Sequence, residues 1–162
     1  MKKTILIALA TLILAGGAFA QLNLKLEGAG HLAISDGENA FSIDGCGILH
    51  MNDMFAFRAQ AFMLEFDPMK FYLGTGLIVD GLIFFEVPAN ITPYGILGLH
   101  LFLEDNYNQM LLNFGGGSEF GSGALRPFAE LIVRILSVSW SGHSDSANSV
   151  SIRGGVRFDL GF

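Results

Sequence analysis

The residues best suited to catalysis lie in a short polar segment near the C-terminal end. Ser141, His143 and Asp145 occur close together, and a serine, a histidine and an acid are the groups of a hydrolase or acyltransferase site. Such a site needs a histidine held within hydrogen-bonding distance of the serine by a third group. A segment rich in serine, glycine and asparagine does not provide that rigidity. We therefore interpret residues 141–149 as a polar loop and predict no catalytic residue.

Three histidines and the single cysteine could in principle bind a metal ion. His31, His50 and His100 lack the close spacing of zinc ligands, so histidines that are satisfied by neighbouring carboxylates are the favoured interpretation. Cys46 lies between two glycines and is interpreted as a small filler rather than a reactive thiol. The three glycines at 115–117 are followed by no helical pattern and indicate a flexible turn rather than a phosphate-binding loop. We predict no metal site and no cofactor.

The first twenty residues have the pattern of a secretory signal peptide. Two lysines follow Met1, residues 4–14 are almost entirely apolar, and Ala18 and Ala20 provide the small residues of a cleavage site. The apolar run is shorter than the roughly 20 residues that a membrane-spanning helix needs, which disfavours a retained anchor. We expect residues 1–20 to be removed and residues 21–162 to form one exported domain.

Charge and composition narrow the class of the exported domain. Loss of two lysines leaves 7 basic against 15 acidic residues, a net charge of −8, and such a surface does not favour nucleic acid. One cysteine cannot form an internal disulfide bond. The mean hydropathy of +0.50 is high, yet the exported domain has no apolar stretch of about 18 residues. High apolar content without a spanning helix is typical of a barrel whose strands alternate between lipid and lumen.

The exported domain shows apolar and polar residues in alternation, interrupted by turn residues, which predicts about eight β-strands. Asn52-Asp53 is typical of a tight turn. Residues 80–90 are read either as a long turn or as extensions of the flanking strands past a bulge. The expected strands cover approximately 22–34, 40–51, 54–66, 69–79, 91–104, 107–116, 124–140 and 150–162.

The side chains that face the barrel interior decide between a membrane barrel and a water-soluble, lipocalin-like binder. The apolar rows are continuous and bulky, as in Phe55, Phe57 and Met63, and the exported domain keeps only two lysines. A narrow lumen has little room for such rows, and a charge facing lipid at the midplane would cost about 2–4 kcal/mol. We therefore expect the polar face inside, where a plug of paired charges comprises Lys25, Glu27, Asp44, Arg58, Glu130, Arg134, Arg153, Arg157 and Asp159.

Strand 124–140 requires a change of register under this assignment. Glu130 and Arg134 make even-numbered residues inward, whereas Leu136 and Trp140 look like members of the outward row. A β-bulge near Leu136 would reconcile the two. Trp140 would then lie at a membrane interface in an aromatic girdle. The expected members of this girdle are Phe41, Phe71 and Trp140.

Two segments carry a resemblance to a known family. The run from Ser151 to Phe162 and the glycine-rich segment from Tyr94 to Leu99 resemble strands of the small outer-membrane barrels typified by the OmpA and OmpX transmembrane domains. The resemblance implies a closed, antiparallel, up-and-down transmembrane β-barrel of about eight strands in the outer membrane of a Gram-negative-type bacterium. It also implies a closing strand that the barrel-assembly machinery recognises, through Val156, Phe158, Leu160 and Phe162.

These observations predict a non-enzymatic barrel with a structural or surface role and no large-solute conduction. The expected partners are outer-membrane lipid and the secretion and assembly machinery, and we expect a monomer. The alternatives are a lipid-modifying barrel enzyme, a soluble lipocalin-like binder, or a binding module or minor channel that uses acidic outer connections. The acidic residues of these connections are Asp36, Glu38, Asp67, Glu104 and Asp105.

Overall fold

The computed structural model describes residues 23–35, 38–66, 68–73, 77–104, 107–140 and 143–160. The expected signal peptide and Phe162 lie outside these ranges. The described residues contain no helix long and apolar enough to cross a membrane. They form nine strands: β1 Asn23–Ser35, β2 Glu38–His50, β3 Phe55–Phe66, β4 Met69–Leu73, β5 Leu77–Phe84, β6 Ile91–Glu104, β7 Tyr107–Phe120, β8 Leu125–Trp140 and β9 His143–Asp159.

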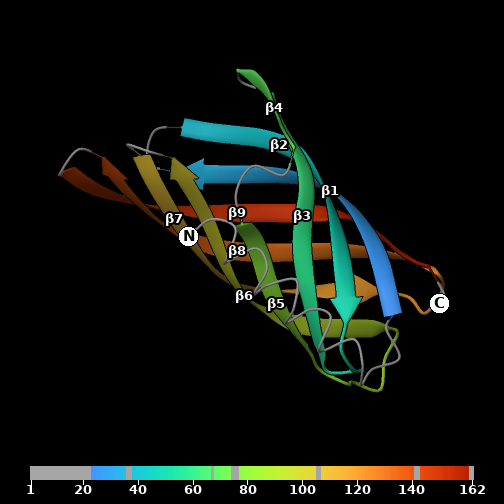
Figure 1. The fold of residues 1–162 in the computed structure, drawn as a ribbon. Helices are drawn as coiled ribbons and strands as arrows, with labels where there is room; N and C mark the ends of the chain where they lie inside the picture. Colours follow the sequence, from blue (N-terminus) through green and yellow to red (C-terminus); the bar gives the residue numbers. More distant parts are fainter. Residues whose placement is uncertain are drawn as a thin grey trace.

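The strands form a closed antiparallel barrel (Figure 1). β1 pairs with β2 on one side and with β9 on the other, so the first and last strands close the sheet. β5 pairs with the first part of β3, where Arg58 faces Asp80, and β4 pairs with its last part, where Leu64 faces Phe71. β4 and β5 therefore lie one after the other beside the same strand, β3, and together count as one strand of the barrel. The predicted closed barrel of eight strands is confirmed.

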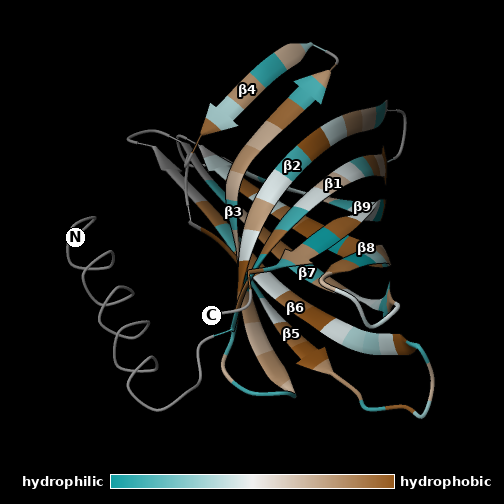
Figure 2. Ribbon diagram, turned by 90° about the vertical axis from the view of Figure 1, so that its right-hand side faces the viewer, coloured by the Kyte–Doolittle hydropathy of each residue, from teal (hydrophilic) through white to brown (hydrophobic). Residues whose placement is uncertain are grey.

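The two ends of the barrel differ. The β1–β2, β3–β4, β6–β7 and β8–β9 connections lie at one end, here called the hairpin end. The strand ends that flank the β2–β3, β5–β6 and β7–β8 connections, and both ends of the described chain, lie at the opposite, terminal end. The β3–β4 hairpin projects beyond the neighbouring strands (Figures 1 and 2), and among the described strands β4 pairs only with β3.

The barrel is apolar outside and charged inside. Hydrophilic and hydrophobic residues alternate along the strands (Figure 2), and paired residues point to the same side of a sheet. On β9, Val156 and Phe158 are 44% and 47% exposed, whereas Arg153 and Arg157 are buried. The water-soluble alternative requires the opposite arrangement, so the orientation of the two faces agrees with a barrel that spans a membrane.

The position of the β-bulge differs from the prediction. The ladders of β8 with β7 and with β9 run without a shift, so the bulge predicted near Leu136 is wrong. Leu136 therefore lies on the inward face of β8, as Glu130 does. The shift occurs instead in the β2–β3 ladder between Gly45 and Cys46. It places Met63 opposite the inward-facing Asp44, so the prediction that Met63 belongs to the outward row is also wrong.

Three strands are longer than predicted. β9 begins at His143, so most of the loop predicted over 141–149 is strand paired with β8. β5 continues to Phe84, and the turn covers only 85–90. The glycines at 115–117 lie within β7 rather than in a flexible turn. A Cβ at Gly115 would lie 2.3 Å from the Leu131 oxygen, so glycine permits a close approach of two strands there.

Candidate functional site in the barrel lumen

The charged side chains of the lumen are brought together by strand register. Each inward residue of one strand stands beside an inward residue of its neighbour. Several of these positions hold opposite charges: Glu27 faces Arg157 across β1 and β9, Glu130 faces Arg153 across β8 and β9, and Arg58 faces Asp80 across β3 and β5. The closure of the sheet then brings these pairs into one buried network.

Glu130 is the centre of this network. Its Oε1 accepts hydrogen bonds from Arg58 Nη1 at 2.6 Å and from Arg157 Nη2 at 2.8 Å, and its Oε2 accepts one from Arg153 Nη1 at 3.2 Å. The Tyr94 hydroxyl donates to Oε1 as well, at 2.8 Å. One buried carboxylate therefore holds three guanidinium groups that come from β3 and β9.

Arg157 is fully buried and contacts four strands besides its own. Its Nε lies 2.5 Å from Glu27 Oε2, and its Nη1 lies 2.7 Å from Glu119 Oε1. Its guanidinium also lies over the rings of Tyr94 and Phe128, at 4.5 and 4.4 Å from their centroids. Charged partners and aromatic faces together replace the water that a buried arginine loses.

Arg58 links the centre to a second polar group. Its Nη2 and Nε donate to Asp80 Oδ2 at 2.7 and 2.9 Å, which is a paired contact of the kind guanidinium groups favour. The other oxygen of Asp80 lies 3.2 Å from His100 Nε2 and 3.1 Å from Asn113 Nδ2. His100 is thus held by a carboxylate, as the interpretation of the lumen histidines expected.

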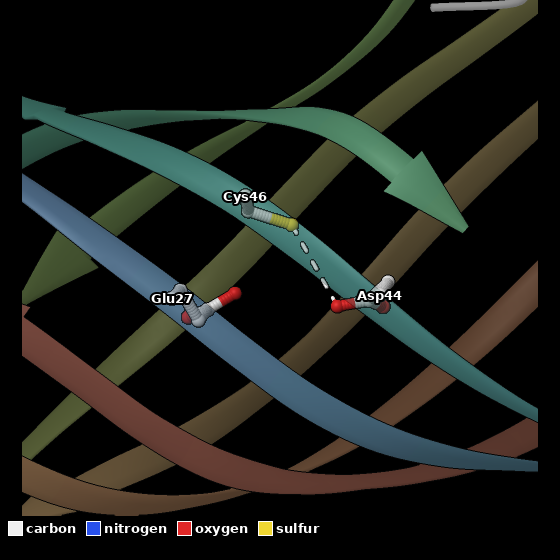
Figure 3. A group of neighbouring side chains, drawn as sticks. All are labelled: Glu27, Asp44 and Cys46. Atoms are coloured by element: carbon white, nitrogen blue, oxygen red, sulfur yellow. Dashed lines mark hydrogen bonds between the residues drawn. The ribbon is translucent and has the colours of Figure 1, made fainter. Parts of the chain in front are cut away.

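Glu27, Asp44 and Cys46 form the only group of possible metal ligands among the described residues, with ligand atoms within 4.8 Å of one another (Figure 3). Arg153 contacts all three. Its Nη2 lies 2.6 Å from Glu27 Oε1 and 3.5 Å from Cys46 Sγ, and it also bonds Asp44. The two carboxylates and the sulfur atom already surround the Arg153 guanidinium and accept its hydrogen bonds. We therefore interpret this group as the binding pocket of the Arg153 side chain.

The predicted site residues are distributed unevenly over this network. Seven of them share its ion pairs: Lys25, Glu27, Asp44, Arg58, Glu130, Arg153 and Arg157. Asp159 lies at the terminal end, where Asn23 Nδ2 donates to its Oδ2 at 3.3 Å. Arg134 takes part in no ion pair with a described residue.

The other predicted positions lie elsewhere. His31 contacts Ser42 Oγ through Nδ1 at 3.1 Å, and the ring of His50 lies 5.0 Å from that of Phe84. The three histidines therefore lie apart. Among the described residues a carboxylate bonds His100, as expected, but none bonds His31 or His50. Phe41 and Phe71 are exposed on the outer face, toward the hairpin end, and the side chain of Trp140 lies outside the described residues.

Sequence reasoning missed three important members of the network. Asp80 begins the segment that the sequence leaves open between a long turn and a strand extension, and Glu119 lies beyond the predicted end of its strand. In the structure both residues lie on the inward face of a strand. Tyr94 was read as part of a glycine-rich strand, but it shares the inward parity of His100. Longer strands would have included Asp80 and Glu119, and the inward face of His100 would have identified Tyr94 within its strand.

The fold and the lumen define a class: a small, closed antiparallel β-barrel with an apolar exterior and an ion-paired interior. Neisserial surface protein A shares this fold, with 13% sequence identity, a TM-score of 0.56, and coverage of 86% of this chain and 97% of that protein. The N-terminal β-barrel domain of Pseudomonas aeruginosa OprF is 15% identical, with a TM-score of 0.49 and coverage of 85% and 100%. No protein-family model and no curated protein matches the chain.

Proposed function

We propose that this chain is an outer-membrane β-barrel of a Gram-negative-type bacterium, with a structural or surface role and no catalytic one. The observation that carries the proposal is the reversed burial of the barrel, with arginines and carboxylates inside and large apolar side chains outside. Water would favour the opposite arrangement, whereas lipid requires an apolar outer face and a closed sheet without free edges along the span. The fold shared with Neisserial surface protein A supports the same class.

The lumen of this barrel is plugged. Arg58, Arg153 and Arg157 extend from β3 and β9 to the shared carboxylate of Glu130, which β8 supplies. Their side chains are at most 3% exposed, so little space for water remains at this level. A solute that crosses the barrel would have to separate several buried ion pairs, each of which is costly to break.

Lipid and the export and assembly machinery are the proposed partners. Val156 and Phe158 of the closing strand are exposed on the outer face, and Leu160 is half-buried. This apolar row is available to lipid in the folded barrel and to an assembly factor before closure. Phe41 and Phe71 provide exposed aromatic rings suited to a membrane interface.

Cell fractionation with a gel-migration assay tests the membrane assignment. We expect the protein in the outer-membrane fraction, with different migration before and after boiling, because a closed barrel resists detergent until it is heated. A known outer-membrane barrel and a periplasmic protein serve as controls. Recovery in the soluble periplasmic fraction, with one migration position before and after boiling, would contradict the assignment.

Planar lipid bilayers test the plug separately. We expect the folded protein to give no large, stable conductance steps, because Glu130 and its three arginines close the lumen. A porin reconstituted at the same protein-to-lipid ratio provides the positive control. Large stable steps from the folded protein would show that the lumen is open, while leaving the membrane assignment intact.

A further inference from the structure

Among the inward-facing arginines, only Arg134 forms no ion pair with a described residue. The network joins five cations, Lys25, Arg58, Arg126, Arg153 and Arg157, to five carboxylates, Glu27, Asp44, Asp80, Glu119 and Glu130. The charges of these groups balance without Arg134. Arg134 therefore has no carboxylate partner among these groups, and Asp159, a further lumen carboxylate, lies at the terminal end beside Asn23.

Arg134 lies on the side of the network nearer the hairpin end. It follows Glu130 and Ile132 on the inward face of β8, and its neighbours across the ladders are Asn113 and Ser149. Its Nε is buried and has no hydrogen-bond partner. A buried donor that belongs to a charged group is costly to leave without an acceptor.

Three further buried atoms near Arg134 also lack partners. One of them is Asn113 Oδ1, an acceptor on the residue directly opposite Arg134 in the β7–β8 ladder. Ser151 stands opposite Ile132 in the β8–β9 ladder, which makes it a diagonal neighbour of Arg134, and its Oγ has no partner although the residue is fully buried. His31 is buried and its Nε2 has no partner. Ser151 stands opposite Ala33 in the β1–β9 ladder, which makes it a diagonal neighbour of His31 as well. Ser151 therefore lies between His31 on β1 and Arg134 on β8.

The hydrogen-bonding capacity of Arg134, Ser151 and His31 matches an anion. The Ser42 hydroxyl can donate to His31 Nδ1, which leaves a proton on Nε2, on the opposite side of the ring. Arg134 and Ser151 also offer N–H and O–H groups. Asp44 and Asp80 act on the Arg134 charge from a distance, but neither forms an ion pair with it. A water molecule would satisfy individual donors but would bring no negative charge into contact with the guanidinium. An oxyanion provides both the acceptors and the charge.

We propose that Arg134, His31 and Ser151 form a binding site for a small oxyanion, either phosphate or a carboxylate, that enters from the hairpin end of the barrel. The site lies beside the plug and uses none of its ion pairs. The inference requires the barrel fold and goes beyond the proposed role of the protein. Failure of the anion site would therefore leave the membrane assignment and the plug unaffected.

Nuclear magnetic resonance of the folded protein in a phosphate-free maltoside detergent tests the site with inorganic phosphate as the probe. At constant ionic strength, we expect saturable shifts of the Arg134 Nε–H and His31 imidazole signals. Arg134→Gln removes no ion pair of the described residues, and it should weaken phosphate binding at least about tenfold, as followed at His31. Ser151→Ala should weaken it as well. Gel migration before and after boiling confirms that each variant is folded.

Arg126→Gln provides the matched control. Arg126 also faces the lumen but lies at the terminal end, where its Nη1 is 3.3 Å from Glu119 Oε2 and its Nε donates to Gly123 O. Its replacement should leave the phosphate titration unchanged. Shifts that do not saturate, or that are equal in the wild type and Arg134→Gln, would overturn the proposal. The absence of any shift would overturn it too, and would assign the orphaned groups to water.

Discussion

Replacement of Glu130 by glutamine should destabilise the folded barrel by about 3–5 kcal/mol, because it removes one partner from a buried ion-pair network. Glu130 accepts hydrogen bonds from Arg58, Arg153, Arg157 and the Tyr94 hydroxyl. The amide keeps the shape of the side chain but loses the charge and one acceptor. Three guanidinium groups would then share the remaining carboxylates in a buried environment. Urea titration in lipid vesicles, with the folded fraction read from gel migration, measures the change.

The exposed residue Glu86 provides the control for this substitution. It lies in the connection between β5 and β6, and it faces solvent. Glu86→Gln is the same chemical change outside the network and should alter the free energy of unfolding by less than about 0.5 kcal/mol. Equal effects of the two substitutions would show that the central carboxylate does not stabilise the barrel.

Replacement of Gly155 by alanine should prevent normal closure of the barrel. A Cβ at this position would lie 2.0 Å from the Gly28 oxygen and 2.7 Å from Ala29 Cα. Both contacts are with the backbone of β1, the strand that closes the sheet against β9, so no side chain can rotate to relieve them. We expect a loss of at least about 3 kcal/mol, at the upper end of overpacking effects, and a large unfolded fraction after refolding into vesicles.

The neighbouring glycine separates this steric effect from a general effect of alanine on the strand. Gly154 lies on the outward face of β9, and a Cβ there would meet Phe128 O at 3.5 Å, an ordinary contact. Gly154→Ala should therefore fold normally by the same refolding assay. A barrel that closes equally well with alanine at either position would show that the β1–β9 seam can adjust.

The two longest rows of alternation could be read correctly without coordinates. In β1 and β9, every second residue is apolar over many positions, and a strand can satisfy this period only by giving one face to lipid and the other to the lumen. Because charges such as Arg153 and Arg157 share one parity, the inward assignment of these strands followed directly. The number of strand positions in the barrel followed from the spacing of the turns.

Register could not be predicted in the same way. Leu136 and Val138 suggested a bulge because apolar residues suit lipid, but both lie at the inward parity near the hairpin end of β8. The actual shift at Gly45 and Cys46 depends on how β2 meets β3. A bulge is a property of two paired strands, and the sequence of one strand does not contain the position of its partner.

The amino-acid sequence alone therefore determined that this chain forms strands with one apolar and one charged face, because alternation is a local property of consecutive residues. Only the tertiary structure decided which charges meet. Glu130 collects arginines that are 23 to 72 residues away, and Arg134, a few residues further along the same strand, has no ion pair with any described residue. Those outcomes depend on the register and closure of the sheet, which set the distances between side chains that are remote in the sequence.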